Sequence, residues 1–159
     1  MADAINAFKA ISDLAPHDSN ALAIFALSLK YNLDDLRTLM AENIVDGSDD
    51  KKADVIYIDP DIGVAAIIQA AYKKDENAEA ASSNKASDLN TAVNWLLSAP
   101  FEKIPDRLKP HTKRLRDLIE NNRIKNLNVW YVHNVHESVN VGKELDTVGV
   151  AARTILKSN

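Results

Sequence analysis

The chain has 159 residues, of which 46% are hydrophobic and 26% are charged, a composition that suits one globular domain with a substantial core. It has no cysteine, which excludes disulfides and thiolate metal sites, and its net charge of −4 argues against a strongly basic nucleic-acid coat. The N-terminal residues show no signal-peptide pattern, and no apolar run has the length of a membrane span. We therefore expect a soluble, cytoplasmic protein without membrane partners.

The first part of the chain predicts three amphipathic helices. Apolar residues recur at helical spacing over residues 4–14, 21–31 and 34–44. Pro16 separates the first two helices, and Asp18 or Ser19 can cap the second. We expect the second helix to turn these apolar residues inward: Leu22, Phe25 and Leu29.

The middle of the chain predicts a β-hairpin. The stretch reads DGSDDKKADVIYIDPDIGVAAIIQAAY and begins at Asp46. Its apolar, β-branched runs are residues 53–59 and 64–72, and they flank a turn that contains Pro60 and Gly63. The polar segment DGSDDKK before the first run could be a solvated loop or part of an approach to a metal.

Two polar residues interrupt the apolar runs of the hairpin. Asp54 opens the first run, and Gln69 lies within the second, where a buried amide needs hydrogen-bond partners. Side chains alternate between the faces of a strand, so Gln69, Ala71 and Lys73 project the same way. Asp54 can share that side if the register of the hairpin allows it.

The second half of the chain predicts helices and one late strand. Residues 73–86 are polar and lack periodicity, so we expect a loop there. Further elements are expected over residues 89–99 (helix), 107–121 (helix), 126–133 (strand) and 140–157 (helix). Because helices intervene, the late strand is expected to run parallel to the second hairpin strand. The pattern predicts an α/β fold, a small mixed sheet flanked by helices after an N-terminal helical segment.

The hairpin resembles the PD-(D/E)XK, or restriction-endonuclease-like, nucleases. In the branch with a glutamine variant the motif reads Asp, a spacer, then Gln-x-Lys; Asp54 and Gln69 match it, and Ala71 occupies the lysine position. The segments ADVIYID, IIQAAY and WYVHNVHESVNVGKEL are similar to the N-terminal nuclease domain of AIPR (abortive infection phage resistance) proteins. The resemblance implies one restriction-endonuclease-like domain over residues 1–159, helical over 1–45 and sheet-containing over 46–159, excised from a longer protein.

The resemblance also implies an activity. It points to a metal-dependent endonuclease of a prokaryotic anti-phage or restriction-type system, acting on nucleic acid, DNA in preference to RNA. Mg²⁺ or Mn²⁺ would be held by Asp54, with Gln69 and Glu42 assisting, because hard cations prefer oxygen ligands. Glu42, on the helix before the sheet, could instead be a plain exposed residue.

Ala71 is where the chain departs from the motif. In the family the lysine is thought to position the water nucleophile and to stabilise charge at the phosphate, and alanine has no ammonium. Three explanations stay open: natural loss of activity, migration of the amine to Lys73, or a deliberate Lys-to-Ala change, which the intact flanking residues favour. We expect little or no cleavage from the chain as it stands, and its metal need not be bound in this form.

Five further residues could contact nucleic acid: Lys73, Lys113, Arg116, His133 and His136. Lys113 and Arg116 belong to the most basic segment, which could instead be a solvated helix face; phosphate contacts there would weaken with salt. The histidines could be ligands, acid–base groups or capping residues. Two other functions stay open: a non-catalytic nucleic-acid-binding or protein-interaction module with a degenerate nuclease fold, and a dimerisation or sensor domain that forms a homodimer.

Overall fold

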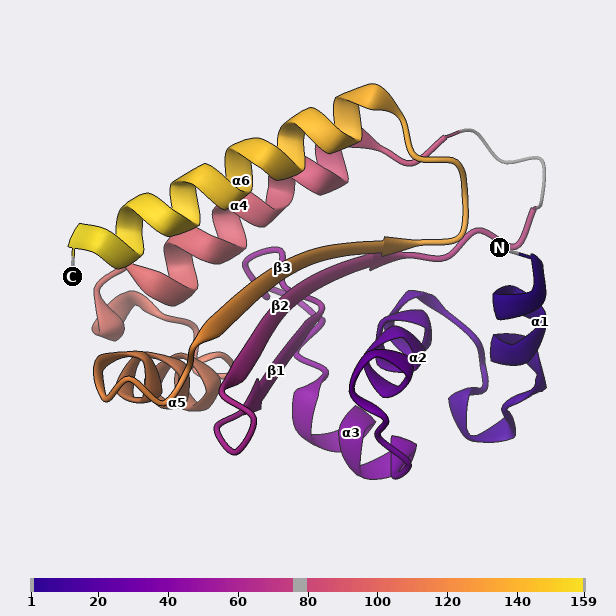
Figure 1. Cartoon of the computed structure of the whole chain (residues 1–159), viewed down its shortest axis with the longest axis horizontal. Helices are drawn as coiled ribbons and strands as arrows, with labels where there is room; N and C mark the ends of the chain where they lie inside the picture. Colours follow the sequence, from indigo (N-terminus) through magenta and orange to yellow (C-terminus); the bar gives the residue numbers. More distant parts are fainter. Residues whose placement is uncertain (1, 76–79, 159) are drawn as a thin grey trace.

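The computed structural model describes residues 2–75 and 80–158 and contains one three-stranded sheet with helices on both faces (Figure 1). The strand order is β1-β2-β3. β1 (Val55–Asp59) runs antiparallel to β2 (Val64–Ala71), and β3 (Asn126–His133) runs parallel to β2. The α/β class, the hairpin and the parallel return of the late strand are confirmed.

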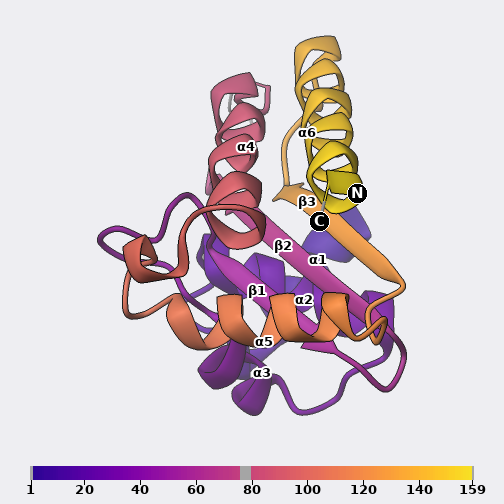
Figure 2. The same cartoon turned by 90° about the vertical axis from the view of Figure 1, so that its left-hand side faces the viewer.

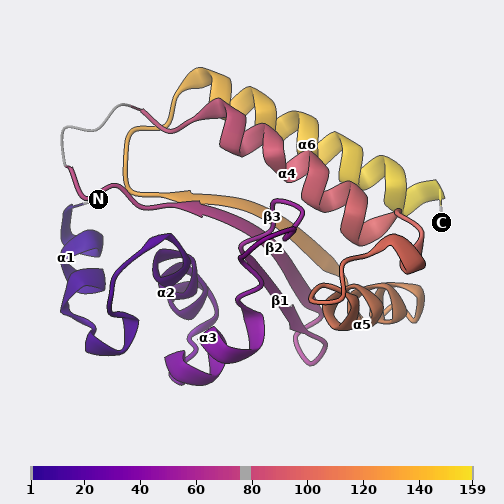
Figure 3. The same cartoon turned by 180° about the vertical axis from the view of Figure 1, so that it is seen from behind.

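Three helices precede the sheet and cover one of its faces (Figure 3). They are α1 (Ala2–Ala10), α2 (Ser19–Tyr31) and α3 (Leu36–Asn43), with a short 3-10 helix, η1 (Ser12–Leu14), after α1. The predicted cap of α2 is Asp18, whose carboxylate accepts a hydrogen bond from the Ala21 amide at 2.9 Å. An acceptor at this position satisfies one of the free amides of the first helical turn.

The prediction that Leu29 points inward is wrong, since its side chain is 66% exposed. The inward positions of Leu22 and Phe25 are confirmed, since both side chains are buried in the core together with Ile24 and Leu27. Tyr31 stacks on Tyr57 and Trp130, with ring centroids 5.4 and 5.9 Å away. This aromatic contact sets the rotation of the helix and leaves Leu29 facing away from the core.

The second half of the chain covers the other face. Its helices are α4 (Ser83–Leu97), α5 (Lys109–Glu120) and α6 (Val139–Ser158), with a short 3-10 helix, η2 (Phe101–Lys103). α4 and α6 lie side by side over the sheet, and α5 crosses near the hairpin turn (Figure 2). The loop predicted over residues 73–86 is too long, because α4 already begins at Ser83; residues 76–79 lie outside the described ones.

Two cores sandwich the sheet, and the alternation of side chains assigns each strand residue to one of them. Val55, Tyr57, Ala66 and Ile68 face the N-terminal helices. Other strand residues face α4, α5 and α6: Ile56, Ile58, Ala65 and Ile67. Because β2 is buried on both faces, it reads as a nearly continuous apolar run. The same alternation turns Gln69 and Ala71 toward the face that α4 covers.

No helix within the described ranges combines the length and the apolar character that crossing a membrane requires.

Candidate functional site

Asp54 lies immediately before β1, where the backbone is held on both sides. Its amide donates to the Ile68 carbonyl at 2.9 Å, and its own carbonyl accepts from Val45 and Asp46 at 2.9 and 3.2 Å. Its carboxylate accepts a 2.7 Å hydrogen bond from the Ala70 amide, and the residue is only 8% exposed. The structure therefore brings the Asp54 carboxylate to the part of β2 that carries Gln69 and Ala71.

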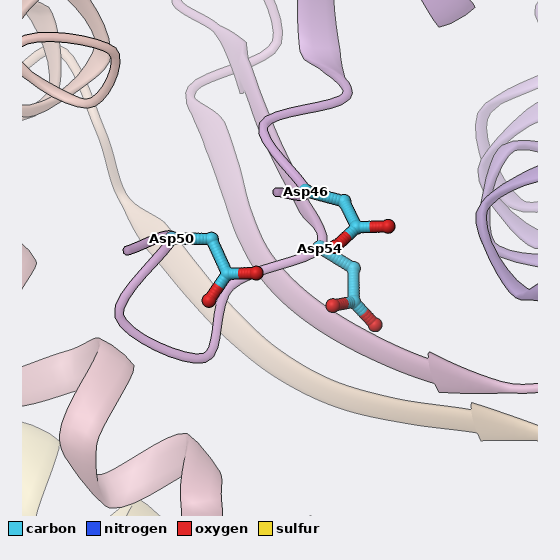
Figure 4. A group of neighbouring side chains, drawn as sticks. All are labelled: Asp46, Asp50 and Asp54. Carbon is cyan, nitrogen blue, oxygen red and sulfur yellow. The ribbon is translucent and has the colours of Figure 1, made fainter. Parts of the chain in front are cut away.

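Two further carboxylates gather around Asp54. Asp46, Asp50 and Asp54 each place one carboxylate oxygen within 4.8 Å of the others (Figure 4). We call these three residues the acidic cluster. Asp46 and Asp50 come from the loop between α3 and β1. From the sequence, this segment could have been either a solvated loop or part of an approach to a metal.

The loop that carries Asp46 and Asp50 is held by specific contacts. Asp50 accepts hydrogen bonds from the amides of Gly47 (3.2 Å) and Lys52 (2.8 Å), and Asp46 accepts from the Asn20 side-chain amide at 2.7 Å. Gly47 has φ of +152°, and a Cβ there would lie 1.7 Å from a guanidinium nitrogen of Arg107. The backbone conformation favours glycine at this position, whereas the flexible end of the Arg107 side chain could move aside for a larger residue.

The acidic cluster is electrostatically unfavourable on its own. Burial raises the pKa of Asp54 to about 6, a value to which the charges of Asp46 and Asp50 also contribute and which the Ala70 amide and Lys85 oppose. A carboxylate that is hard to ionise beside two others has much to gain from a cation. Carboxylate oxygens are the ligands that Mg²⁺ and Mn²⁺ prefer.

Gln69 provides a separate observation that fits a cation. The residue is 3% exposed, and its Oε1 has no hydrogen-bond partner within the described part of the chain. A buried amide oxygen without a donor costs free energy unless something else satisfies it. Gln69 directly precedes Ala70 on β2, and the Ala70 amide binds the Asp54 carboxylate. A metal held by Asp54 could therefore take the Gln69 amide oxygen as a further ligand. The donor set therefore fits a hard divalent cation.

Glu42 does not join this cluster, in contrast to the sequence prediction. Its side chain is exposed on α3, and its backbone carbonyl accepts a 2.9 Å hydrogen bond from His111. It lines a separate hollow of about 340 Å³, with Tyr57, His111 and Arg114 among the other lining residues. The extra carboxylates come from the following loop because that loop folds back over the start of β1, which helical spacing could not reveal.

Beside Ala71 the surface forms a hollow of about 370 Å³, which we call the Ala71 hollow. Its lining residues are Ala71, Lys73, Ala80, Ala81, Ser82, Lys85, Tyr131 and Val135. Burial raises the pKa of Tyr131, and the charge of Asp54 adds to the shift, so its phenol stays protonated. A lysine at position 71 would extend into this space.

Lys85, like Asp46 and Asp50, was not among the site residues predicted from the sequence. It lies in the first turn of α4, within the segment predicted to be a loop, and its ammonium donates to the Ala70 carbonyl at 3.3 Å. Its charge reaches Asp54, whose pKa it lowers. The signal that could have identified it is the serine pair at 82 and 83, typical of a helix start, with Lys85 following within one turn.

The other predicted nucleic-acid contacts are scattered. Arg116 is half-buried, and its guanidinium donates to the carbonyls of Leu96, Trp95 and Ala99 at 2.8, 3.0 and 2.8 Å, so it closes the C-terminal end of α4 rather than facing solvent. Lys113 is exposed and pairs with Asp117 at 2.7 Å. It lines a hollow with Pro60 of the hairpin turn, at the opposite end of β2 from Ala71.

The histidines lie closer to the Ala71 hollow. His133 is paired with Ala71 in the parallel register, and its Nδ1 lies 3.0 Å from the Val135 carbonyl. Its ring packs against Tyr131 with centroids 4.9 Å apart. His136 is exposed, and its backbone carbonyl accepts from the Ala81 amide at 2.8 Å. Lys73 and His133 are thus near the site, whereas Lys113 and Arg116 serve other parts of the fold.

The fold and the site together define an α/β domain with three carboxylates and a buried, unpaired amide oxygen at one end of a three-stranded mixed sheet. Comparisons with protein-family models, with curated proteins and with solved structures gave no match.

Proposed function

We propose that this chain is a metal-dependent nuclease domain, which hydrolyses phosphodiesters of DNA or RNA in a prokaryotic anti-phage or restriction-type system. The observation that carries the proposal is the position of the Asp54 carboxylate, bound to the Ala70 amide at 2.7 Å between Gln69 and Ala71 on β2. This arrangement is what the resemblance to the PD-(D/E)XK nucleases requires. The acidic cluster supports it independently, as does the Gln69 Oε1, which has no hydrogen-bond partner among the described residues.

In this proposal Asp46, Asp50 and Asp54 hold Mg²⁺ or Mn²⁺, with the Gln69 Oε1 as a further ligand. The bound cation supplies Lewis acidity toward the phosphate and a lowered pKa for its water. The chain itself orients the carboxylates: the Ala70 amide fixes Asp54, the Asn20 amide fixes Asp46, and the amides of Gly47 and Lys52 fix Asp50. Preorganised ligands of this kind reduce the cost of assembling the site.

The remaining parts of the proposal concern the biological setting. DNA is preferred over RNA as the substrate, the location is cytoplasmic, and other domains of a longer chain or a second copy of this one contribute target selection. The net charge of −4 supports the need for help from elsewhere, because the acidic cluster alone repels a nucleic acid. Ala71 in place of the motif lysine lowers the expected rate.

A second candidate function is a non-catalytic nucleic-acid-binding or protein-interaction module with a degenerate nuclease fold. The observation that favours it is Ala71, since the motif position holds no ammonium. Such a module would bind nucleic acid without divalent metal. Its binding would also be unchanged when lysine is introduced at position 71.

The test compares four proteins: the chain as it stands, Ala71→Lys, Asp54→Asn, and the double variant Ala71→Lys/Asp54→Asn. Each is incubated with labelled single-stranded DNA, duplex DNA or RNA in Mg²⁺, Mn²⁺ or EDTA, and products are resolved on a denaturing gel. We expect metal-dependent cleavage that is strongest in Ala71→Lys and absent in both Asp54→Asn proteins. A folded Ala71→Lys protein that cuts none of these substrates with either metal would refute the nuclease proposal.

A further inference from the structure

At the end of β2, the backbone of Ala70 contacts two side chains of opposite charge, Asp54 and Lys85. Within a strand, the amide and carbonyl of one residue face the same edge. Beyond the last pair of the hairpin, Val55 with Ile68, the edge of β2 continues past β1. There the Ala70 amide binds the Asp54 carboxylate at 2.7 Å, and the Ala70 carbonyl accepts from the Lys85 ammonium at 3.3 Å. Asp54 and Lys85 therefore meet the same edge at the same residue.

Lys85 is a positive residue at a helix N-terminus, where negative charge is normally favoured. The first turn of α4 holds no acidic residue and carries this lysine, although the positive end of the helix dipole favours negative charge there. The same helix end, together with Lys73, Lys85 and the protonated Tyr131, surrounds the Ala71 hollow with groups that favour an anion. Residues placed against local preference are typical of functional sites.

We infer that Lys85 supplies the ammonium that Ala71 lacks, and that the Ala71 hollow binds a phosphate of the nucleic acid next to the acidic cluster. The inference rests on the proposed nuclease function and names its phosphate-binding residue. It also changes the explanation of Ala71, because the motif amine then comes from α4 rather than from β2. In the Ala71→Lys protein, two ammonium groups, at positions 71 and 85, would lie beside the same phosphate.

Lys73, the alternative offered by the sequence, is less suited to this role. β2 ends at Ala71, and Lys73 lies in the exposed segment that follows, where its amide and carbonyl bind the side chain of Asn134 at 2.8 and 2.7 Å. Both lysine side chains line the Ala71 hollow. The Lys85 ammonium also donates to the Ala70 carbonyl of β2, beside Asp54. Lys73 is expected to add general attraction for phosphate only.

The test measures binding separately from cleavage. The probes are inorganic phosphate, followed by amide chemical shifts in NMR spectra, and a fluorescein-labelled single-stranded DNA 12-mer, followed by anisotropy in Mg²⁺. The proteins are the unsubstituted chain, Lys85→Ala, Lys85→Ala/Ala71→Lys, and Lys30→Ala as a matched control, an exposed lysine on α2 at the other face of the sheet. Circular dichroism confirms that each protein is folded.

We expect phosphate to shift the amides of Ala71 and Ala81 in the unsubstituted chain. Lys85→Ala should weaken binding of the 12-mer about tenfold, the usual effect of losing a charge-assisted hydrogen bond. Ala71→Lys should restore it in the double variant, and Lys30→Ala should match the unsubstituted chain. Absence of phosphate binding, Lys85→Ala binding as tightly as the control, or failure of Ala71→Lys to restore binding would each overturn the inference.

Failure of the nuclease proposal would look different. In that case no protein, including Ala71→Lys, would cleave nucleic acid with Mg²⁺ or Mn²⁺, whatever the binding measurements show. Loss of binding in Lys85→Ala without any cleavage would keep the phosphate site and assign it to a non-catalytic module. Cleavage that is unaffected by Lys85→Ala would keep the nuclease and remove Lys85 from its site.

Discussion

Ala70 binds Asp54 through its amide at 2.7 Å, although the two residues lie 16 positions apart in the chain. The carboxylate takes the place that a neighbouring strand would occupy, because β1 begins one residue later. This contact holds a buried acid at the edge of the sheet, beside two other carboxylates and an unpaired amide oxygen.

The metal-free protein should lose stability as the pH rises from about 4 to about 6. Asp54 has a folded-state pKa of about 6, whereas an unfolded aspartate has about 3.9, so the folded state binds this proton more tightly. The loss of folding stability caused by ionising Asp54 is absent below pH 4 and reaches its full size, up to about 3 kcal/mol, above pH 6. Urea unfolding in EDTA across this range measures it. Asp54→Asn should remove this part of the slope; an identical pH profile in both proteins would contradict the assignment.

Mg²⁺ should stabilise the protein through the acidic cluster. A cation relieves the repulsion among Asp46, Asp50 and Asp54 and competes with the Asp54 proton, so the rise in Tm with Mg²⁺ should grow between pH 5 and about 7. Differential scanning fluorimetry at several Mg²⁺ concentrations measures the effect. Asp54→Asn should abolish it. Asp61→Asn, an exposed acid of the hairpin turn, should keep it, and equal responses in both variants would argue against this site.

Gln69→Leu should separate stability from metal binding. In the metal-free protein the substitution removes a buried amide oxygen that has no donor, so the free energy of unfolding should rise by about 1 kcal/mol. The same change should reduce the Mg²⁺-induced rise in Tm, because one oxygen ligand is lost. Chemical unfolding in EDTA and in Mg²⁺ gives both values. A variant that is destabilised in EDTA yet responds fully to Mg²⁺ would show that Gln69 has only a structural role.

Arg116→Ala should act on stability and leave nucleic-acid binding unchanged. Its guanidinium donates to three carbonyls at the end of α4, and their loss should cost about 2 kcal/mol. Lys113→Ala should have a much smaller effect on stability, because it breaks only an exposed pair with Asp117. Unfolding curves compare the two. Binding of a DNA 12-mer at several salt concentrations checks the second part: a shallower salt dependence in Arg116→Ala would return this residue to the nucleic-acid interface.

Much of the fold could be predicted from local pattern. The sequence predicted the strand that spans Asn126–His133, with the bounds that the structure has, and Asp18 was one of the two residues predicted to cap α2. The inward position of Leu29 could not be judged in this way. The stacking of Tyr31 on two sheet residues rotates α2, and that contact joins parts of the chain far apart in sequence.

The residues of the candidate site also fall into two groups, those recognised in the sequence and those found only in the structure. Asp54 and Gln69 could be identified from the sequence because they interrupt apolar strand patterns, and the period of two places Gln69 and Ala71 on one face. Ala71 was identified through the resemblance to the nuclease motif. Glu42 was chosen by analogy and lies elsewhere, while Asp46, Asp50 and Lys85 were brought in by the folding of a loop and the packing of α4 over the sheet. The sequence by itself thus determined the helices, the hairpin and the polar residues within it. Only the tertiary structure decided which charges meet, because those contacts depend on segments that approach one another through space and leave no periodic signal in the chain.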